Sequence, residues 1–294
     1  MVSFATDGAV AVEGGNWRIF DGMVARSGAN VQLNTAVTAI DFANKKDKTS
    51  SPRYSISIKS TTASADEDLA THFDGVIIAS PWQYSDIKAP SDLLSQTIDS
   101  IPYTKLHVTL FASPLRLRPG FFGLKPTDRS PKSVYTTLRK DEKPHLGKKG
   151  VGDTGFYSIS TLRTATNPKR TDRVEYLYKI FSVEEVTASF LSDLLGAEVP
   201  KDIVSDDGPI TWHHARVFNS YPYELPRVTF QDPVVGDKVY YTSGIESFIS
   251  CMETSALMGM NVAKLAIEDL LKGNGEVQSG EADERLISMM PDEL

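Results

Sequence analysis

Four segments in the middle of the chain are rich in β-branched and aromatic residues, and long polar loops separate them. They cover residues 105–113, 132–139, 155–162 and 174–182. Side chains of these types favour strands, and short strands joined by polar turns build antiparallel sheets. The sequence therefore predicts an antiparallel sheet domain, which we place at residues 91–234.

One helix is expected to interrupt this sheet domain, over residues 183–196. We expect Ser182 to cap it, because a serine hydroxyl can accept from the free N–H groups of a first helical turn. Glu184 and Glu185 would then stand in that turn, where negative charge suits the helix dipole.

The segments that flank the sheet domain predict a second unit of mixed type. A Gly-Gly-Asn turn at 14–16 leads into apolar residues with helical spacing, which end at Ser27-Gly28. Residues 31–42 alternate like a strand pair with a tight bend, and residues 54–61 alternate like a further strand. Residues 74–81 contain a continuous apolar run, which predicts a fully buried strand.

Residues 239–271 predict a closing strand, a sharp turn and a long helix. Gly244 permits the turn, and Glu246 can accept hydrogen bonds from the hydroxyls of a sugar-like chain. Free N–H groups at the helix start would stabilise partial negative charge near Met252, Glu253 and Thr254. Small residues share one helix face, which we expect to pack on a sheet: Ala256, Gly259, Ala263 and Ile267. A packed helix with Glu246 as its cap would explain the same residues without a ligand.

Composition limits the classes of partner. The 294 residues are 40% apolar, enough for a globular core, and the net charge of -7 argues against nucleic acid or an anionic membrane surface. No apolar run approaches the roughly 20 residues that span a bilayer, and residues 1–15 lack the pattern of a signal peptide. With one cysteine, Cys251, and five histidines without ligand spacing, we expect no disulfide framework and no metal site.

A literal GxGxxG lies at residues 150–155. Such a motif binds a dinucleotide when a buried strand precedes it and a helix follows, because the helix N-terminus holds the pyrophosphate. Here a polar loop precedes the glycines and a strand is expected after them. We therefore interpret this segment as a loop.

The order of four elements resembles flavoproteins of the monoamine oxidase type. These elements are the Gly-Gly turn with its helix, a strand similar to LNTxV at 33–37, a strand similar to VIxAxP at 76–81, and the glycine-acid turn before the last helix. Further sequence segments resemble those of the prenylcysteine oxidase, or prenylcysteine lyase, family. They are residues 12–17, 179–182, 221–226, 240–246 and 252–265.

The resemblance implies an α/β fold with α+β character, the C-terminal part of an FAD/NAD(P)-binding flavoprotein. Residues 1–90 and 235–272 would form an incomplete Rossmann-type FAD domain around the substrate-binding sheet domain, and residues 273–294 a mobile acidic tail. The family begins with a Rossmann strand, glycine loop and helix, and nothing similar is found before residue 12, so we expect the chain to be truncated.

The resemblance also implies a cofactor, FAD, and a reaction: oxidative cleavage of the thioether in farnesylcysteine or geranylgeranylcysteine, with O2 as acceptor, to cysteine, a prenyl aldehyde and hydrogen peroxide. It implies a lysosomal, vacuolar or secretory location. An amine-oxidizing flavoenzyme and a non-catalytic isoprenoid-binding fragment stay open as alternatives. The expected cofactor-binding residues are Gly14, Gly15, Asn16, Val37, Ala79, Gly244, Ile245, Glu246, Met252, Glu253 and Thr254.

The substrate would need an apolar pocket that excludes water. Tyr221 and Tyr223, in the YPYxxP run, are the preferred candidates to line it. His213 and His214 are candidates for a base that activates water, because an imidazole titrates near neutral pH. Other aromatic residues could line the pocket or lie in an ordinary core: Tyr135, Phe156, Tyr157, Tyr176, Tyr178 and Phe181.

Overall fold

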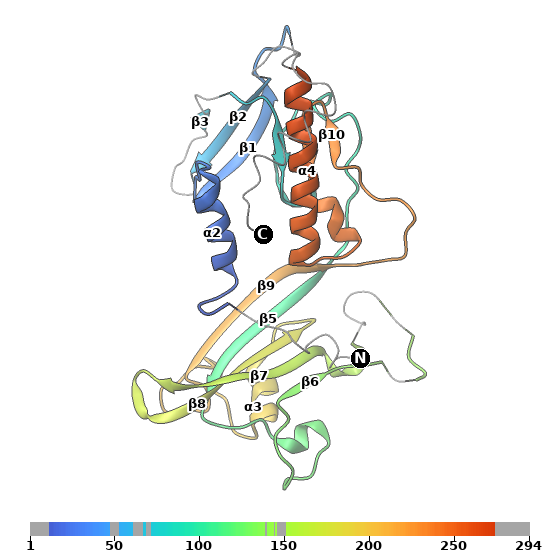
Figure 1. The fold of residues 1–294 in the computed structure, drawn as a ribbon. Coiled ribbons are helices and arrows are strands. Elements are labelled where there is room, and N and C mark those ends of the chain that lie inside the picture. The colour runs from blue at the N-terminus through green and yellow to red at the C-terminus, as the bar shows by residue number, and fades with distance from the viewer. Residues whose placement is uncertain are drawn as a thin grey trace.

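The structure, a computed structural model, describes residues 12–47, 53–60, 67–68, 72–138, 140–143, 145 and 151–273. Figure 1 shows two units: a five-stranded sheet with one short helix, and above it two small sheets with two longer helices. The expected tail at 273–294 falls almost wholly outside the described residues, as do residues 1–11 and the first glycine of the GxGxxG segment.

The five-stranded sheet is antiparallel throughout, which confirms the prediction for the middle of the chain. Its strand order is β6-β7-β8-β5-β9. The strands are β5 (Tyr103–Ser113), β6 (Ser133–Tyr135), β7 (Phe156–Asn167), β8 (Arg170–Ser182) and β9 (Trp212–Pro222). β7 directly follows the last glycine of the GxGxxG segment, so no helix stands there to bind a pyrophosphate. The interpretation of that segment as a loop is thereby confirmed.

Helix α3 (Ala188–Leu195) covers one face of this sheet. Its Leu191 and Leu194 are fully buried against residues of the three central strands, among them Phe111, Ile159, Tyr178 and Ile180. Ser182 is not its cap, and that expectation is wrong. Because β8 extends to Ser182, the helix starts later: Thr187 is the N-cap, and its Oγ1 accepts from the N–H of Phe190 at 3.2 Å. The first turn accordingly has no acidic residue.

The upper unit is built on two three-stranded sheets. One contains β1 (Thr35–Phe42), β2 (Tyr54–Ser60) and β3 (Glu67–Asp68), and the other contains β10 (Val234–Gly236), β11 (Val239–Tyr241) and β4 (Val76–Ile78). β4 and β11 are parallel. The two sheets share a core cluster of buried residues: Ile40, Tyr54, Ile56, Ile78, Leu93, Val235, Val239 and Tyr241.

Two strand expectations in this unit are wrong. Residues 31–42 form one strand rather than a pair, because the chain turns through Asn34 in a left-handed conformation (φ 54°) before β1 begins. The apolar run at 74–81 is not fully buried. Ile78 faces the core, but β4 is an edge strand with an open face, and the side chain of Ile77 is 50% exposed.

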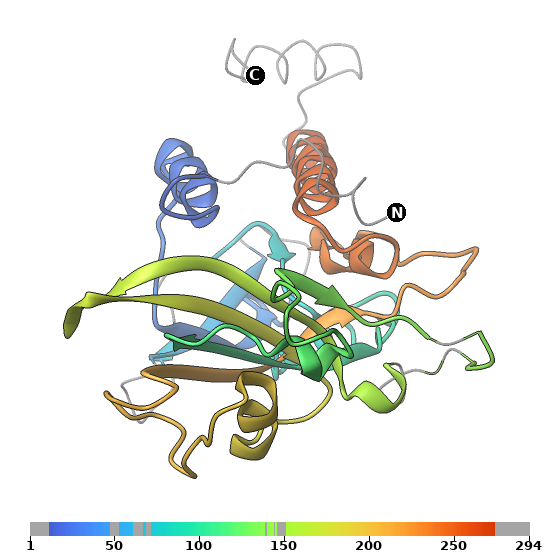
Figure 2. The ribbon, with the colours of Figure 1, turned by 90° about the horizontal axis from the view of Figure 1, so that it is seen from below.

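Helix α2 (Trp17–Ser27) ends at Gly28 in the left-handed conformation (φ 67°), as its sequence predicts. None of its residues is buried. Helix α4 (Met252–Gly273) lies against β11 and buries Val262. Figure 2 shows α2 and α4 on one side of the five-stranded sheet and α3 on the other.

The small-residue face of α4 does not pack on the sheet, and that expectation is wrong. Ala256, Gly259 and Ala263 are exposed, while Met258, Val262 and Leu265 are buried or half-buried. The helix is rolled so that its longer apolar side chains meet the sheet, since these bury more apolar surface than alanine or glycine. A Cβ at Gly259 would meet nothing within 4 Å.

Candidate functional site

The glycine-acid turn lies where the two units meet. It forms a short 3₁₀ helix, η5 (Ser243–Ser247), directly after β11. Gly244 is required there by packing, because a Cβ at this position would lie 2.7 Å from the Cβ of Gln231. The turn holds Glu246 half-buried, facing the first residue of β5.

A hydrogen bond from Tyr103 joins Glu246 to the five-stranded sheet. The Tyr103 hydroxyl donates to Oε2 of Glu246 at 2.6 Å. Burial raises the pKa of Tyr103, and the hydrogen bond and negative charge of Glu246 raise it further, so the proton stays on the phenol. The ring of Tyr84, from the 3₁₀ helix η1 (Trp82–Tyr84), packs edge-on against Tyr103 with centroids 5.6 Å apart.

A second contact joins the sheet to the start of α4. After β9, Glu224 accepts a hydrogen bond through Oε1 from the N–H of Ser250 at 3.0 Å. Phe230 and Phe248 pack edge to face nearby along the chain, with centroids 5.5 Å apart. The ends of β5 and β9 are therefore both tied to the segment that carries the predicted cofactor residues.

The N-terminus of α4 already uses part of its N–H donor capacity. The N–H of Cys251, just before the helix, donates to Oγ1 of Thr254 at 3.4 Å, and that hydroxyl donates to the carbonyl of Ile249 at 2.7 Å. A hydrogen bond from its own backbone N–H is the main cause of the lowered pKa of Glu253, whose exposed carboxylate thus sits at the helix start. Met252 beside it is also exposed.

The Gly14–Gly15 turn starts α2 as the sequence predicts. Both glycines have positive φ (84° and 116°), which a residue with a side chain rarely adopts. Asn16 Oδ1 accepts from the N–H of Val12 at 3.1 Å, and the Trp17 indole donates to the carbonyl of Gly14 at 2.9 Å. In Figure 1 both α2 and α4 begin at the ends that point toward the five-stranded sheet.

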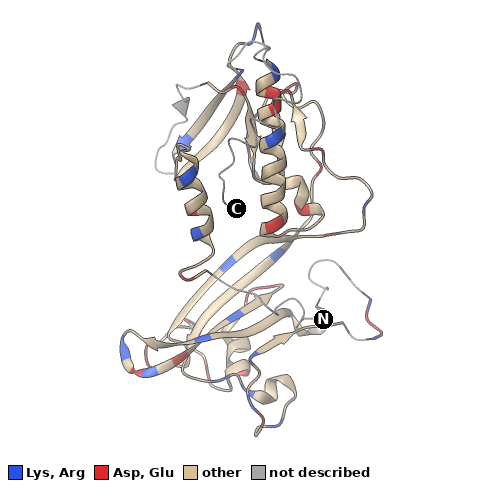
Figure 3. Cartoon of the chain, viewed as in Figure 1, with Lys and Arg blue, Asp and Glu red and all other residues tan. Residues whose placement is uncertain are grey.

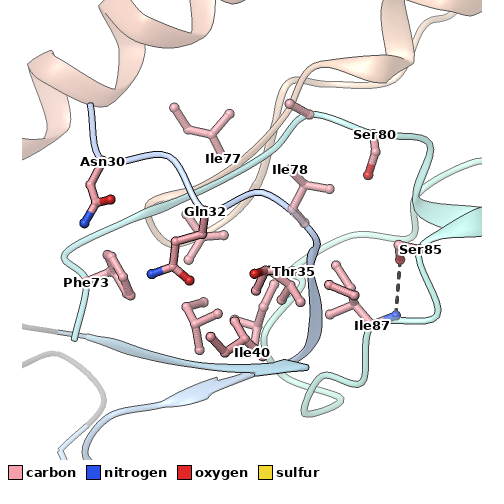
Figure 4. Close-up of a pocket in the computed structure, with 16 residues that line it drawn as sticks. Asn30, Gln32, Thr35, Ile40, Phe73, Ile77, Ile78, Ser80, Ser85 and Ile87 are labelled. Carbon is pink, nitrogen blue, oxygen red and sulfur yellow. Dashed lines mark hydrogen bonds between the residues drawn. The ribbon is translucent and has the colours of Figure 1, made fainter. Parts of the chain in front are cut away.

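Val37, in β1, and Ala79, directly after β4, line the same cavity. The cavity of about 710 Å³ lies between β1, β2 and β4, and Figure 4 shows its side chains converging from these elements. The walls of the cavity are mainly aliphatic, and Ile77 is one of the residues that line it (Figure 4). Five polar residues also line it: Asn30, Gln32, Thr35, Ser80 and Ser85. Such a volume and lining suit a flat heteroaromatic ring.

Tyr221 and Tyr223 lie at the junction. Tyr221 is 53% exposed and pairs with Thr104, next to Tyr103. The N–H of Tyr223 donates to the carbonyl of Pro102 at 2.8 Å. Two of the other aromatic candidates, Phe156 and Tyr178, are buried in the cluster under α3 and so belong to an ordinary core.

Comparison with known proteins identifies the family. A model of the prenylcysteine lyase family matches residues 1–279. The chain belongs to the prenylcysteine lyase family. Farnesylcysteine lyase of Arabidopsis thaliana is 28% identical over 264 residues, which are 88% of this chain and 42% of the relative. Prenylcysteine oxidase 1 of Homo sapiens is 24% identical over 267 residues, 90% of this chain and 48% of the relative. The chain thus spans less than half the length of these relatives.

The two histidines lie apart from the other candidate residues of this prenylcysteine lyase family member. Nine strand positions separate His213 from Pro222 at the junction end of β9, or about 30 Å. His213 pairs with Phe111 and so shares the α3 face, whereas His214 pairs with Leu110 on the opposite face. His213 Nε2 is buried without a hydrogen-bond partner, and burial lowers the pKa of this side chain. The two imidazoles thus face opposite sides of the sheet and lie away from the junction, and a role for either as a base stays a prediction.

Sequence reasoning did not single out Tyr103 and Tyr84. Tyr103 precedes the expected strand at 105–113, and its partner Glu246 is 143 positions away. A single sequence carries no signal for such a pair. Among the described residues of this family member, no three His, Cys, Asp or Glu side chains gather as metal ligands, and no helix is long and apolar enough to cross a membrane.

Proposed function

We propose that this chain is part of an FAD-dependent prenylcysteine oxidase that cleaves the thioether of farnesylcysteine or geranylgeranylcysteine. Family membership supports this proposal, as do the names of the relatives, farnesylcysteine lyase and prenylcysteine oxidase. The observation that carries it is the junction: the glycine-acid turn is bonded to the sheet that would hold the substrate.

The chain's residues fit FAD at two separated places. The cavity with Val37 and Ala79 has the size and apolar lining for the adenine ring. At the junction, Glu246 keeps Oε1 as an acceptor for ribityl hydroxyls, and the start of α4 suits the electron-rich pyrimidine edge of the flavin. When bound, FAD supplies the two-electron oxidation of the carbon beside sulfur.

The sheet would bind the prenyl chain on the face that α3 leaves uncovered. Alternation along β5 places Val108 and Leu110 there, both half-buried, because Phe111 points into the core under α3. Leu106, nearer the junction on the same face, is fully buried and would form the floor of this stripe rather than its open surface. Val108 pairs with Phe181 of β8, and Leu106 pairs with Phe218 of β9. This stripe leads from the junction along β5, so a prenyl chain on it would leave the thioether near Tyr221 and Glu246.

Figure 3 shows acidic and basic residues spread over both units. The stripe on β5 carries apolar side chains, which matches an isoprenoid better than a charged amine substrate. This favours a thioether substrate with a long hydrocarbon chain over a small amine.

The test is direct. The purified chain is incubated with FAD, freed of excess cofactor, and examined for the visible flavin bands; peroxide release is then measured with farnesylcysteine and with a panel of amines. Retained flavin with peroxide from farnesylcysteine is the expected result. Turnover of amines alone would contradict the proposed substrate, and a colourless protein would contradict cofactor binding by this chain.

A further inference from the structure

We propose that Tyr103 is a positioning residue that holds Glu246 for the ribityl chain of the cofactor, an inference that rests on the proposed function. The contact is a charge-assisted hydrogen bond of 2.6 Å from the phenol to Oε2. It uses one carboxylate oxygen, and the described part of the chain offers no donor to the other, Oε1. Tyr103 thereby fixes the direction in which Glu246 presents its free acceptor.

Hydrogen bonds also fix the backbone just before Tyr103. Gln83, in η1, donates through Nε2 to the carbonyl of Ile101 and accepts through Oε1 from the N–H of Ile101, both at 2.7 Å. The ring of Tyr84 packs on that of Tyr103. Because both the strand entry and the ring are constrained, the phenol reaches Glu246 in one preformed geometry.

Tyr241 is the other phenol near Glu246, and these two described residues share no hydrogen bond in the structure. The Tyr241 hydroxyl accepts from the N–H of Trp82 at 3.4 Å, and its ring is buried in the core cluster of the upper unit. Tyr103 is the one that comes from the five-stranded sheet. The sheet that would carry the substrate therefore sets the orientation of the residue that would bind the cofactor.

The chemistry defines the ligand group that Glu246 can take. A carboxylate whose partner keeps its proton is an acceptor only, so the group on Oε1 must be a donor such as a hydroxyl. The polyol part of FAD offers such hydroxyls. An analogue of FAD that lacks the contacted hydroxyl should lose the hydrogen bond to Glu246 and keep its other contacts with the chain.

The experiment combines a protein change with a ligand change. Dissociation constants for FAD and for analogues that each lack one ribityl hydroxyl are measured by quenching of flavin fluorescence, on the wild-type chain and on Tyr103→Phe. For the analogue that lacks the contacted hydroxyl, we expect the wild-type chain to bind FAD about tenfold more tightly than the analogue, because one hydrogen bond to a charged group contributes about that much. For Tyr103→Phe, we expect FAD to bind only about two- to threefold more tightly than the same analogue. Glu246→Ala should bind FAD and that analogue equally.

Tyr84→Phe is the matched control, because it removes a phenolic hydroxyl one ring away and leaves the Tyr103–Glu246 bond in place. It should keep the tenfold preference. Equal weakening of FAD and all analogues by Tyr103→Phe would show a merely structural role and overturn the proposal, as would an unchanged preference or a wild-type chain that does not bind FAD. These affinities are independent of turnover, so absence of peroxide from farnesylcysteine would contradict the proposed substrate and leave this result standing.

Discussion

Tyr103 and Glu246 are 143 positions apart in sequence, and their side chains meet at 2.6 Å. Tyr103 is the first residue of β5 in one unit, and Glu246 lies in the turn after β11 in the other. Burial raises the pKa of Tyr103 well above its ordinary range, so the phenol remains a donor to Glu246 throughout the neutral pH range. Tyr103 thus provides one contact between the two units, beside the Glu224–Ser250 hydrogen bond, and its phenol keeps its proton throughout the neutral range.

Filling the cavity beside β4 should abolish flavin retention. Ala79 lines this cavity with an exposed side chain, so Ala79→Trp adds a large ring to the cavity without disturbing a buried neighbour. We expect an unchanged far-ultraviolet circular dichroism spectrum and loss of bound FAD by at least about tenfold in affinity, because the ring would occupy ligand space. Ala165→Trp, in a different cavity on β7, is the control and should retain FAD. Equal retention by both variants would refute this placement of the cofactor.

The buried carboxylate of Glu175 should make stability depend on acid pH. Burial alone would raise its pKa, but hydrogen bonds from Asn167, Thr211 and Arg173 outweigh this and lower it. A lowered folded-state pKa means that the stabilisation is complete above the ordinary value of 4.5 and is lost as pH falls through the lowered value.

Glu175→Gln tests this account. We expect it to reduce the free energy of unfolding at pH 7 by about 2–4 kcal/mol, since Arg173 loses its partner. Urea titrations from pH 7 down to pH 3 should show the difference from wild type shrinking below about pH 4.5. Glu198→Gln, at an exposed position, serves as the control and should follow the wild-type curve. A difference that stays constant with pH would contradict the proposed linkage.

Removal of the α3 cap should cost about 1 kcal/mol. Thr187 Oγ1 accepts the hydrogen bond from Phe190, so Thr187→Ala leaves that N–H without its partner, whereas Thr187→Ser keeps an acceptor. Thermal unfolding should rank wild type and Thr187→Ser together, with Thr187→Ala lower. If the alanine variant were as stable as wild type, another group would have to satisfy the helix start.

Truncation of Leu194 should be among the more damaging single changes. It is fully buried in the cluster under α3, and Leu→Ala changes at such positions cost about 2–5 kcal/mol through lost burial and a residual cavity. Val228→Ala, at a side chain that is 97% exposed, should change the unfolding free energy by less than about 0.5 kcal/mol. Chemical denaturation of both variants measures this contrast, and similar losses would argue against the packing of α3 on the sheet.

Local patterns predicted the elements well where a strong rule applies. The Gly14–Gly15 turn, the end of α2 at Gly28 and the strand-turn-helix at the C-terminus follow from glycine conformation and helical spacing. The start of α3 did not, because β8 continues to Ser182 and pairing with β5 overrides the capping tendency of that serine. The sequence did not predict β9, because its pattern is too polar to indicate a strand. β9 forms because it pairs with β5 along the length of that strand.

The candidate site was less predictable, for a physical reason. A residue type and its neighbours suggest what Glu246 can bind, but not that Tyr103 holds it, since the two meet only through the fold. The orientation of α4 about its axis was equally hard to predict. The sequence shows that Ala256 and Gly259 share a face, but the longer side chains on the other face determine which side meets β11. The separation of His213 from Tyr221 along β9 likewise depends on which end of the strand reaches the junction.

The absence of any buried residue in α2 has a consequence for hydrogen exchange. An 11-residue helix is shorter than the roughly 12–15 residues at which isolated helices become marginally stable, and here no packing adds to it. Its amides should exchange by local opening, at rates close to those of a free peptide. The amides of β11, whose three residues are all buried, should exchange only through global unfolding. The Gly14–Gly15 turn adjoins this weakly protected helix, so slowed exchange of the α2 amides would report a ligand bound at the turn.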